Sequence, residues 1–328
     1  MFDKKLEIAQ QAVLESMRLC KTIQMEMTGK NEITKSDKSP VTTADFTSQA
    51  IICKMLDLRF PNIPIVGEER SDALRKPENS AIVDNVFHYI ESNEHTREFL
   101  NRENLFECID LGDGEPNETE FWTVDPVDGT KGFLRGEQFA VALALIVNGQ
   151  VKLGVLGCPN MEIPGDISKH GYLLYAVRGS GAFLLNIESN ITRKISISTI
   201  TNPEKMRFVE SYEASHSNLE MQLEIARRLN LSGEPVQMDS QVKYGVLASG
   251  NGEIYLRIPN PGSKDYKEKI WDHAAGSIIV QEAGGIASDI YGKPLDFKAG
   301  KTLKNNTGIL ASVPSIHNRI VELVKELS

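Results

Sequence analysis

The chain has 328 residues, of which 41% are hydrophobic and 25% charged, and its formal net charge is −9. This is the composition of an ordinary globular protein with room for two domains. The acidic balance argues against extended nucleic-acid binding, which needs basic surface to displace counterions. The longest apolar run, residues 139–147, is too short to span a bilayer, and the N-terminus has no secretory apolar core. We therefore expect a cytoplasmic protein without membrane or nucleic acid polymer partners, whose four scattered cysteines are reduced and mostly buried.

The first half of the chain is predicted to begin with two helices. Apolar residues at helical spacing extend to about Met27, and a second helix is expected over residues 42–59, ended by Pro61. Residues 63–66 are then typical of a short strand. Residues 70–118 are charged and only partly helical in pattern, and the sequence assigns them no function.

From residue 121 the pattern changes to strands. Short apolar runs separated by turns predict an antiparallel sheet formed by residues 121–124, 139–147, 151–157 and 172–177. Farther along, expected strands at 207–210, 241–248 and 254–257 alternate with expected helices at 221–229 and 273–282. The fold class is therefore α/β, with an α+β domain at residues 1–205 and an α/β domain at residues 206–328.

The strongest chemical motif is DPVDGT at residues 125–130, which follows an expected strand. Asp125 and Asp128 leave this strand at a sharp turn, and clustered carboxylates supply the oxygen ligands that Mg²⁺ prefers. Gly129 lets the backbone approach a ligand closely, and the amides that follow could hold a phosphate. An ordinary Asp-rich turn is the alternative, and for a lone motif of this kind it is the commoner explanation.

Three further acidic residues have the same two explanations. Glu68 follows the short strand of the first half, where it could face a metal or simply lie in an exposed turn. Asp45 could serve the site, or it could complete a capping box with Thr42. Asp272, just ahead of the last expected helix, could be merely an N-cap. The occurrence of four such sites in one chain, with no other catalytic pattern, favours the functional explanation.

Several other chemistries are excluded by spacing. An EF-hand loop starting at Asp125 would place Val127 at its third position, where an oxygen ligand is required. Phosphatases that form an aspartyl-phosphate use two aspartates separated by one residue, whereas two residues separate Asp125 from Asp128. The sequence has no phosphate loop, no H-E-x-x-H motif and no G-x-S-x-G elbow, and its six histidines show no metal spacing. Attack by water, assisted by metal ions, remains.

Three motifs, in order along the chain, resemble those of the lithium-sensitive, magnesium-dependent phosphatase superfamily. They are GEE at residues 67–69, DPVDGT at 125–130 and WDHAAG at 271–276. Members of that superfamily include inositol monophosphatases, inositol polyphosphate 1-phosphatases and 3′(2′),5′-bisphosphate nucleotidases. The resemblance extends from Asp45 to Gly285. It implies a layered αβαβα sandwich whose active site lies between two domains.

The resemblance also implies the roles of the acidic residues. The implied ligands of two to three Mg²⁺ ions are Glu68, Asp125, the Val127 carbonyl, Asp128 and Asp272. Asp125 would bridge two of the ions, and Asp45 with Glu68 could help to bind a third more weakly. Asp45 and Thr130 would orient and deprotonate the attacking water. Inhibition by Li⁺, which occupies a magnesium position in this superfamily, is implied in the same way.

The C-terminal half narrows the resemblance to the bisphosphate nucleotidases, which hydrolyse 3′-phosphoadenosine 5′-phosphate to AMP. The segments that carry it are SHS at residues 215–217, DSQVKYG at 239–245 and YLR at 255–257. The implied substrate-binding residues are Gly129, Thr130, His216, Ser240, Lys243 and Arg257. A second phosphate away from the metals needs its own cations, which Lys243 and Arg257 could supply from their expected strands.

Other functions stay open at this point. The nearest alternative is a phosphatase of the same fold that acts on inositol phosphates, and 3′-phosphoadenosine 5′-phosphosulfate is a further possible substrate. From other classes, the chain could be a non-catalytic anion-binding protein, or an inert scaffold with acidic turns. The substrate is expected to be a small nucleotide and the protein a monomer.

Overall fold

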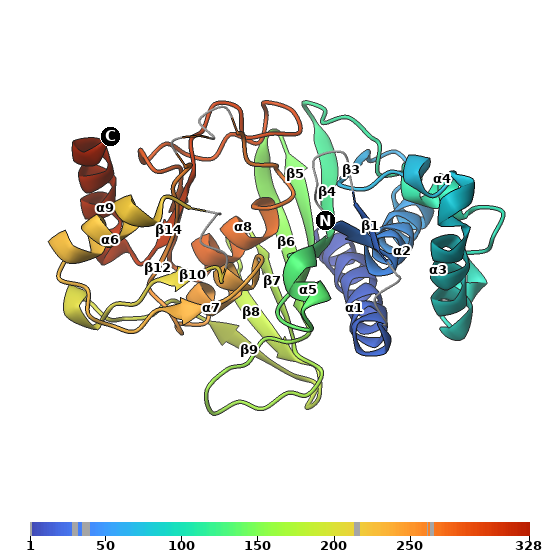
Figure 1. The fold of residues 1–328 in the computed structure, drawn as a ribbon, viewed down its shortest axis with the longest axis horizontal. Helices are drawn as coiled ribbons and strands as arrows, with labels where there is room; N and C mark the ends of the chain where they lie inside the picture. The colour runs from blue at the N-terminus through green and yellow to red at the C-terminus, as the bar shows by residue number, and fades with distance from the viewer. Residues whose placement is uncertain (1, 28–31, 35–39, 213–216, 261, 263–265) are drawn as a thin grey trace.

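The computed structural model describes residues 2–27, 32–34, 40–212, 217–260, 262 and 266–328. Helices and sheets alternate in layers across the long axis of the molecule (Figure 1). The N-terminal helices lie at one end of this stack, and the C-terminal helix lies at the other.

A seven-stranded sheet dominates the first half of the chain, in the order β3-β4-β5-β6-β7-β8-β9. β3 is parallel to β4, and every later neighbour is antiparallel, which confirms the predicted antiparallel sheet. The strands are β3 (Ile65–Gly67), β4 (Glu120–Asp128), β5 (Ala140–Val147), β6 (Gln150–Cys158), β7 (Tyr172–Val177), β8 (Gly181–Asn186) and β9 (Ile191–Ile195). Because helices cover both faces of its centre, β5 is apolar along its whole length.

Helices cover the outer face of this sheet. They are α1 (Asp3–Glu26), α2 (Thr43–Arg59), α3 (Ser80–Ser92) and α4 (Leu105–Asp110). The first two confirm the predicted helices, and the last two pack on α2 and lie within the segment that the sequence left unassigned. The rest of that segment includes the 3-10 turns Ser71–Ala73, Pro77–Asn79 and Thr96–Glu98. A short hairpin, β1 (Glu32–Thr34) and β2 (Pro40–Thr42), precedes α2.

The opposite face of the sheet carries α7 (Val242–Ala248) and α8 (Ala274–Glu282). Beyond these helices lies an antiparallel sheet in the order β12-β14-β13, formed by Ile254–Arg257, Ile309–Ser312 and Ile286–Ser288. A parallel pair, β10 (Val209–Glu210) and β11 (Val236–Gln237), adjoins it through a bridge from Phe208 to Ile254. The last layer contains α6 (Leu219–Arg228) and α9 (Pro314–Leu327).

Three apolar clusters bind the layers together. The first lies between α1–α4 and the large sheet, the second between that sheet, α7, α8 and the smaller sheet, and the third under α6 and α9. This order confirms the predicted αβαβα sandwich. The boundary predicted after residue 205 falls between β9 and β10 and stays a prediction, because α8 packs directly on β5 to β8.

One predicted element is wrong. Residues 241–248 were expected to form a strand, but α7 is a helix, so Lys243 projects from a helix and only Arg257 from a strand. All seven residues of α7 are buried, because the helix is enclosed between the two sheets. A helix enclosed on every side has no polar face and therefore no 3.6-residue period to distinguish it from a buried strand.

Two smaller expectations can also be compared with the structure. All four cysteines are free and buried, as predicted. Among the described helices, none combines the length and apolarity needed to cross a bilayer.

Candidate active site

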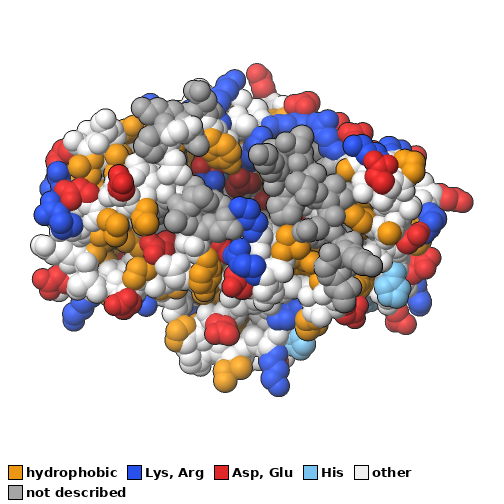
Figure 2. Space-filling model, in the orientation of Figure 1, with side chains coloured by type: hydrophobic (Ala, Val, Ile, Leu, Met, Phe, Trp, Pro, Cys, Tyr) orange, Lys and Arg blue, Asp and Glu red, His pale blue; other side chains and the backbone are white. Residues whose placement is uncertain are grey.

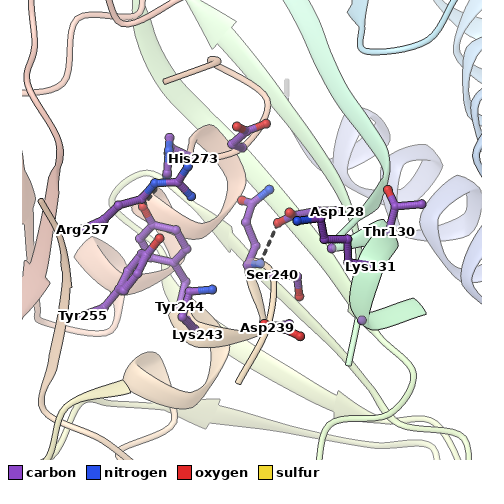
Figure 3. Close-up of a pocket in the computed structure, with 14 residues that line it drawn as sticks. Asp128, Thr130, Lys131, Asp239, Ser240, Lys243, Tyr244, Tyr255, Arg257 and His273 are labelled. Atoms are coloured by element: carbon purple, nitrogen blue, oxygen red, sulfur yellow. Dashed lines mark hydrogen bonds between the residues drawn. The ribbon is translucent and has the colours of Figure 1, made fainter. Parts of the chain in front are cut away.

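A cavity of about 200 Å³ opens between the end of β4 and the elements of the C-terminal half. In Figure 2, acidic side chains lie recessed near the centre of the visible face. Figure 3 shows Asp128 and Thr130 on one side of the cavity and Tyr255, Arg257 and His273 on the other. The lining residues come from the turn after β4, the start of α7, strand β12 and the segment before α8.

The turn at the end of β4 is built around Gly129. The pairing of β4 with β5 shifts register between Asp125 and Asp128, and Gly129 follows with φ 88°. A Cβ atom at Gly129 would lie 2.8 Å from the Cβ atom of Ser240, so the position requires glycine. The chain then enters α5 (Thr130–Leu134), and the Thr130 hydroxyl donates to the Val127 carbonyl at 3.2 Å.

Asp125 lies at the centre of a group of carboxylates. It is buried, and within the described residues its Oδ1 has no hydrogen-bond partner. Burial raises the pKa of Asp125 well above its usual value, and the charges of Glu68, Asp128 and Asp272 raise it further. The fold therefore brings together the acidic residues that the sequence placed on separate elements.

The other two aspartates of the group have distinct surroundings. Asp128 accepts a hydrogen bond from the Gln241 amide at 2.6 Å, and burial raises its pKa to about 6 although Lys243 opposes the shift. Burial, followed by the charges of Asp128 and Glu68, raises the pKa of Asp272 well above its usual value. Asp272 does not cap α8, because His273 occupies the N-cap position.

Asp45 forms the capping box that the sequence suggested, and it also lies near the acidic group. Its Oδ2 accepts from the Thr42 amide and hydroxyl, each at 2.7 Å, and the Thr42 hydroxyl accepts from the Ala44 amide. The capping box is therefore present at the start of α2. Asp45 is also near enough to raise the pKa of Asp125, so the cap fixes a carboxylate at the edge of the acidic group.

Glu68 is half-buried in the loop after β3, and a residue that the sequence did not single out holds this loop. The Gln49 side chain, from α2, accepts from the Glu69 amide at 2.9 Å and donates to the Glu69 carbonyl at 2.5 Å. A Cβ atom at Gly67 would lie 2.7 Å from Gln49 Oε1. Gln49 therefore fixes the path of the chain on both sides of Glu68.

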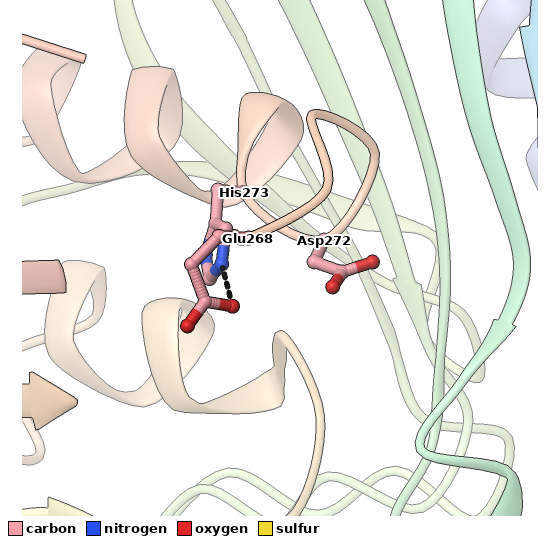
Figure 4. A group of neighbouring side chains, drawn as sticks. All are labelled: Glu268, Asp272 and His273. Carbon is pink, nitrogen blue, oxygen red and sulfur yellow. Dashed lines mark hydrogen bonds and ion pairs between the residues drawn. The ribbon is translucent and has the colours of Figure 1, made fainter. Parts of the chain in front are cut away.

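Glu268, Asp272 and His273 form a second group close enough in space to hold a metal ion (Figure 4). His273 Nε2 lies 3.1 Å from Glu268 Oε2, and Glu268 Oε1 accepts from Arg257 Nε at 2.9 Å. Both oxygens of Glu268 are therefore engaged by other side chains. The histidine spacing in the sequence gave no indication of this group.

The cationic side of the cavity contains both predicted phosphate ligands. Lys243 is buried and donates to the Ser211 hydroxyl at 3.0 Å, and its Nζ lies 5.3 Å from the centre of the Tyr255 ring. Burial lowers the pKa of Lys243 to about 8, although Asp128 opposes the shift. Arg257 and Ser240, which the sequence proposed as substrate-binding residues, also line the cavity, and their role stays a prediction.

Three further observations concern residues around the cavity. His216 lies outside the described residues. Lys131 and Asp239 line the cavity although the sequence did not assign them, and Asp239 pairs with Arg135. A second cavity of about 170 Å³ shares Tyr255 and Arg257 with the first. It is also lined by Glu210, Ser211, Tyr212, Ser217, Leu219, Gln222, Gln237 and Leu256.

Comparisons with known proteins agree with this geometry. The family model described as the inositol monophosphatase family matches residues 3–328. A 3'(2'),5'-bisphosphate nucleotidase of Schizosaccharomyces pombe is 41% identical over 98% of this chain and 95% of its own length. One from Oryza sativa is 40% identical, with the same coverage.

Solved structures with the same fold are more distant in sequence. The Thermotoga maritima IMPase superposes with a TM-score of 0.67 at 21% identity, and covers 99% of this chain and 98% of its own. The extragenic suppressor protein suhB of Bartonella henselae gives a TM-score of 0.68, also at 21% identity, with 99% of both chains covered. At this level of identity these structures support the fold alone.

Proposed function

The chain belongs to the inositol monophosphatase family, and we propose that it is a Mg²⁺-dependent 3′(2′),5′-bisphosphate nucleotidase. In the proposed reaction, water removes the 3′-phosphate of 3′-phosphoadenosine 5′-phosphate (PAP) and releases AMP. The observation that carries the proposal is the pairing of two unlike sites around one cavity. Carboxylates lie on one side, and Lys243 and Arg257 lie on the other.

The carboxylate side suits divalent metal ions. Buried acidic groups that repel one another, with the Asp125 Oδ1 atom left without a protein partner in the described chain, are the donor set that a hard cation requires. We assign Glu68, Asp125, the Val127 carbonyl, Asp128 and Asp272 as ligands of two to three Mg²⁺ ions. Bound Mg²⁺ supplies an activated water and neutralises charge that develops on the phosphoryl group.

The chain's own residues complete the reaction centre. Asp45, held by the Thr42 cap, orients and deprotonates the attacking water together with Thr130. The Thr130 hydroxyl is directed at the Val127 carbonyl, which places it beside a proposed metal ligand. The backbone at Gly129 and Thr130, which both line the cavity, approaches the phosphate closely, since glycine has no side chain.

The other side of the cavity is proposed to select the substrate. Lys243 and Arg257 bind the 5′-phosphate by charge-assisted hydrogen bonds, with Ser240 as a further donor and His216 as the remaining proposed contact. The second cavity, of about 170 Å³, shares Tyr255 and Arg257 with the first and is also lined by Tyr212, so we propose that the planar base stacks there. An inositol monophosphate has no second phosphate to engage these cations.

The proposal is tested by phosphate release from PAP with Mg²⁺, compared with release from inositol 1-phosphate and inositol 1,4-bisphosphate, with EDTA as control. We expect rapid, EDTA-sensitive release from PAP. Release only from the inositol esters would keep the metal site but overturn the assigned substrate. No phosphate release from any of the three substrates would favour a non-catalytic anion-binding protein.

The same preparation tests the finer assignments. Inhibition by Li⁺, hydrolysis of 3′-phosphoadenosine 5′-phosphosulfate and a monomeric mass in solution are each expected. We also propose a role in sulfur metabolism and a cytoplasmic location, and localising the tagged protein checks the location.

A further inference from the structure

A continuous series of buried hydrogen bonds lies behind the cationic wall of the cavity. It connects Arg257 to Glu268, Glu268 to His273, and His273 to Tyr244, whose hydroxyl lies 2.8 Å from His273 Nδ1. The side chains of Glu268 and His273 are only 6% and 1% exposed. Arg257 is the member of the series whose side chain also borders both cavities.

The direction of the hydrogen bonds to Glu268 follows from the chemistry of its partners. Burial raises the pKa of Glu268, but Arg257 and His273 outweigh burial and bring that pKa down to about 2. An ionised carboxylate only accepts, so His273 Nε2 must donate to it. The other ring nitrogen of His273, Nδ1, lies 2.8 Å from the Tyr244 hydroxyl, so both nitrogens of the ring have hydrogen-bond partners.

This arrangement argues against Glu268 as a metal ligand, although it lies close to Asp272. A cation that drew the Glu268 carboxylate away from its present partners would replace the bond to Arg257 or the bond to His273. Either replacement would leave a buried donor without its partner, which is costly. The side chain instead acts on Arg257, since its Oε1 takes the Nε–H of the guanidinium.

We propose that Glu268 is a positioning residue that fixes Arg257 for recognition of the substrate's second phosphate. This inference rests on the proposed function. With Nε paired to Glu268, the planar guanidinium is fixed at the cavity that Arg257 lines, where its remaining N–H groups would meet the phosphate oxygens. Fixing a long side chain before binding removes part of the entropic cost of ordering it in the complex.

The test compares PAP with 3′-AMP, which has the same reacting phosphate but no 5′-phosphate. Glu268→Gln keeps the shape of the side chain and removes its charge. We expect the ratio of kcat/KM for PAP to kcat/KM for 3′-AMP to fall about tenfold, mainly through KM for PAP. Any change in Mg²⁺ affinity that results from the nearby Asp272 affects both substrates and cancels from the ratio.

A matched control is available in the same half of the chain. Glu253 is also buried and also accepts from an arginine Nε, that of Arg207, at 3.3 Å, but neither residue lines the cavity. Glu253→Gln should reduce thermal stability in a similar way and leave the substrate ratio unchanged. A fall in the ratio in both variants would mean that reduced stability of the fold, and not a change in the position of Arg257, lowers the ratio.

The double variant Arg257→Ala, Glu268→Gln keeps the proposal testable if Glu268→Gln alone does not fold. It removes both charges, and its substrate ratio should equal that of Arg257→Ala alone, because Glu268 acts only through Arg257. A further fall in the double variant, or an unchanged ratio in Glu268→Gln, overturns the inference. A wild-type protein that fails to hydrolyse PAP, or does not prefer it to 3′-AMP, overturns the proposed function itself.

Discussion

The pH dependence of substrate selection follows from the surroundings of Lys243. Burial lowers the pKa of this lysine to about 8, so its positive charge is lost in the mildly alkaline range where an exposed lysine keeps it. In the proposed function, only the protonated form of Lys243 attracts the 5′-phosphate. We therefore expect kcat/KM for PAP to fall as the pH rises above about 8.

The size of the fall follows from the titration of one group. One pH unit above its pKa, about a tenth of the lysine remains protonated, so kcat/KM for PAP should fall about tenfold for each further pH unit. The rate for 3′-AMP, which has no 5′-phosphate, should show no such limb. Lys243→Arg keeps its charge throughout this range and should remove the limb even if it binds PAP less well.

The assay is phosphate release from both nucleotides between pH 6.5 and 9.5, at constant ionic strength and saturating Mg²⁺. Lys21→Arg serves as a control, because burial also lowers the pKa of Lys21, and this side chain donates to the Pro159 carbonyl away from the cavity. Its profile should match the wild type. A limb that survives in Lys243→Arg, or that appears equally with 3′-AMP, would refute the reasoning.

Three substitutions test the acidic side. Asp128→Asn should reduce turnover at least a hundredfold, on the order of several kcal/mol, because it removes a proposed metal ligand, and circular dichroism should show an intact fold. Unchanged activity would contradict the assignment of Asp128 as a metal ligand. Gly129→Ala should lower the free energy of unfolding by about 1–3 kcal/mol and reduce activity, because the new Cβ atom would lie 2.8 Å from that of Ser240 and φ is 88°. A urea unfolding curve that matches the wild type would contradict the claim that this position requires glycine. Thr42→Ala should cost about 1 kcal/mol through the lost cap and should also lower kcat, whereas Thr42→Ser keeps both; a loss of stability without a loss of kcat would separate the cap from the function of Asp45.

The acidic site was predictable because its residues occur in short local motifs. DPVDGT places two carboxylates, a turn and a glycine within six residues, and the structure shows the tight turn that this pattern predicts. The strands of the large sheet were visible for the same reason, as continuous apolar runs with turn residues between them. Asp45 shows that two local explanations need not compete. The Thr42 cap holds the carboxylate that acts on Asp125.

The features that the sequence did not predict depend on which residues surround a side chain in the folded protein. α7 was taken for a strand because burial on all sides removed its period. Gln49 is one glutamine in a helix, and nothing near it in the sequence indicates that it holds the loop around Glu68, 19 positions away. Such contacts depend on how layers pack, which residue patterns alone do not encode.

The carboxylate side and the cationic side of the cavity also differ in how far the sequence reveals them. The carboxylates can be recognised one motif at a time, because each brings its own turn and its own oxygen. The cationic side depends on the state of each charge, and that state is set by distant partners. Arg257 is fixed by Glu268, from the segment before α8, and Lys243 is desolvated by its position between two sheets. Sequence motifs thus indicate which reaction the site could perform, whereas the packing of the C-terminal half determines how strongly it could distinguish one phosphate ester from another.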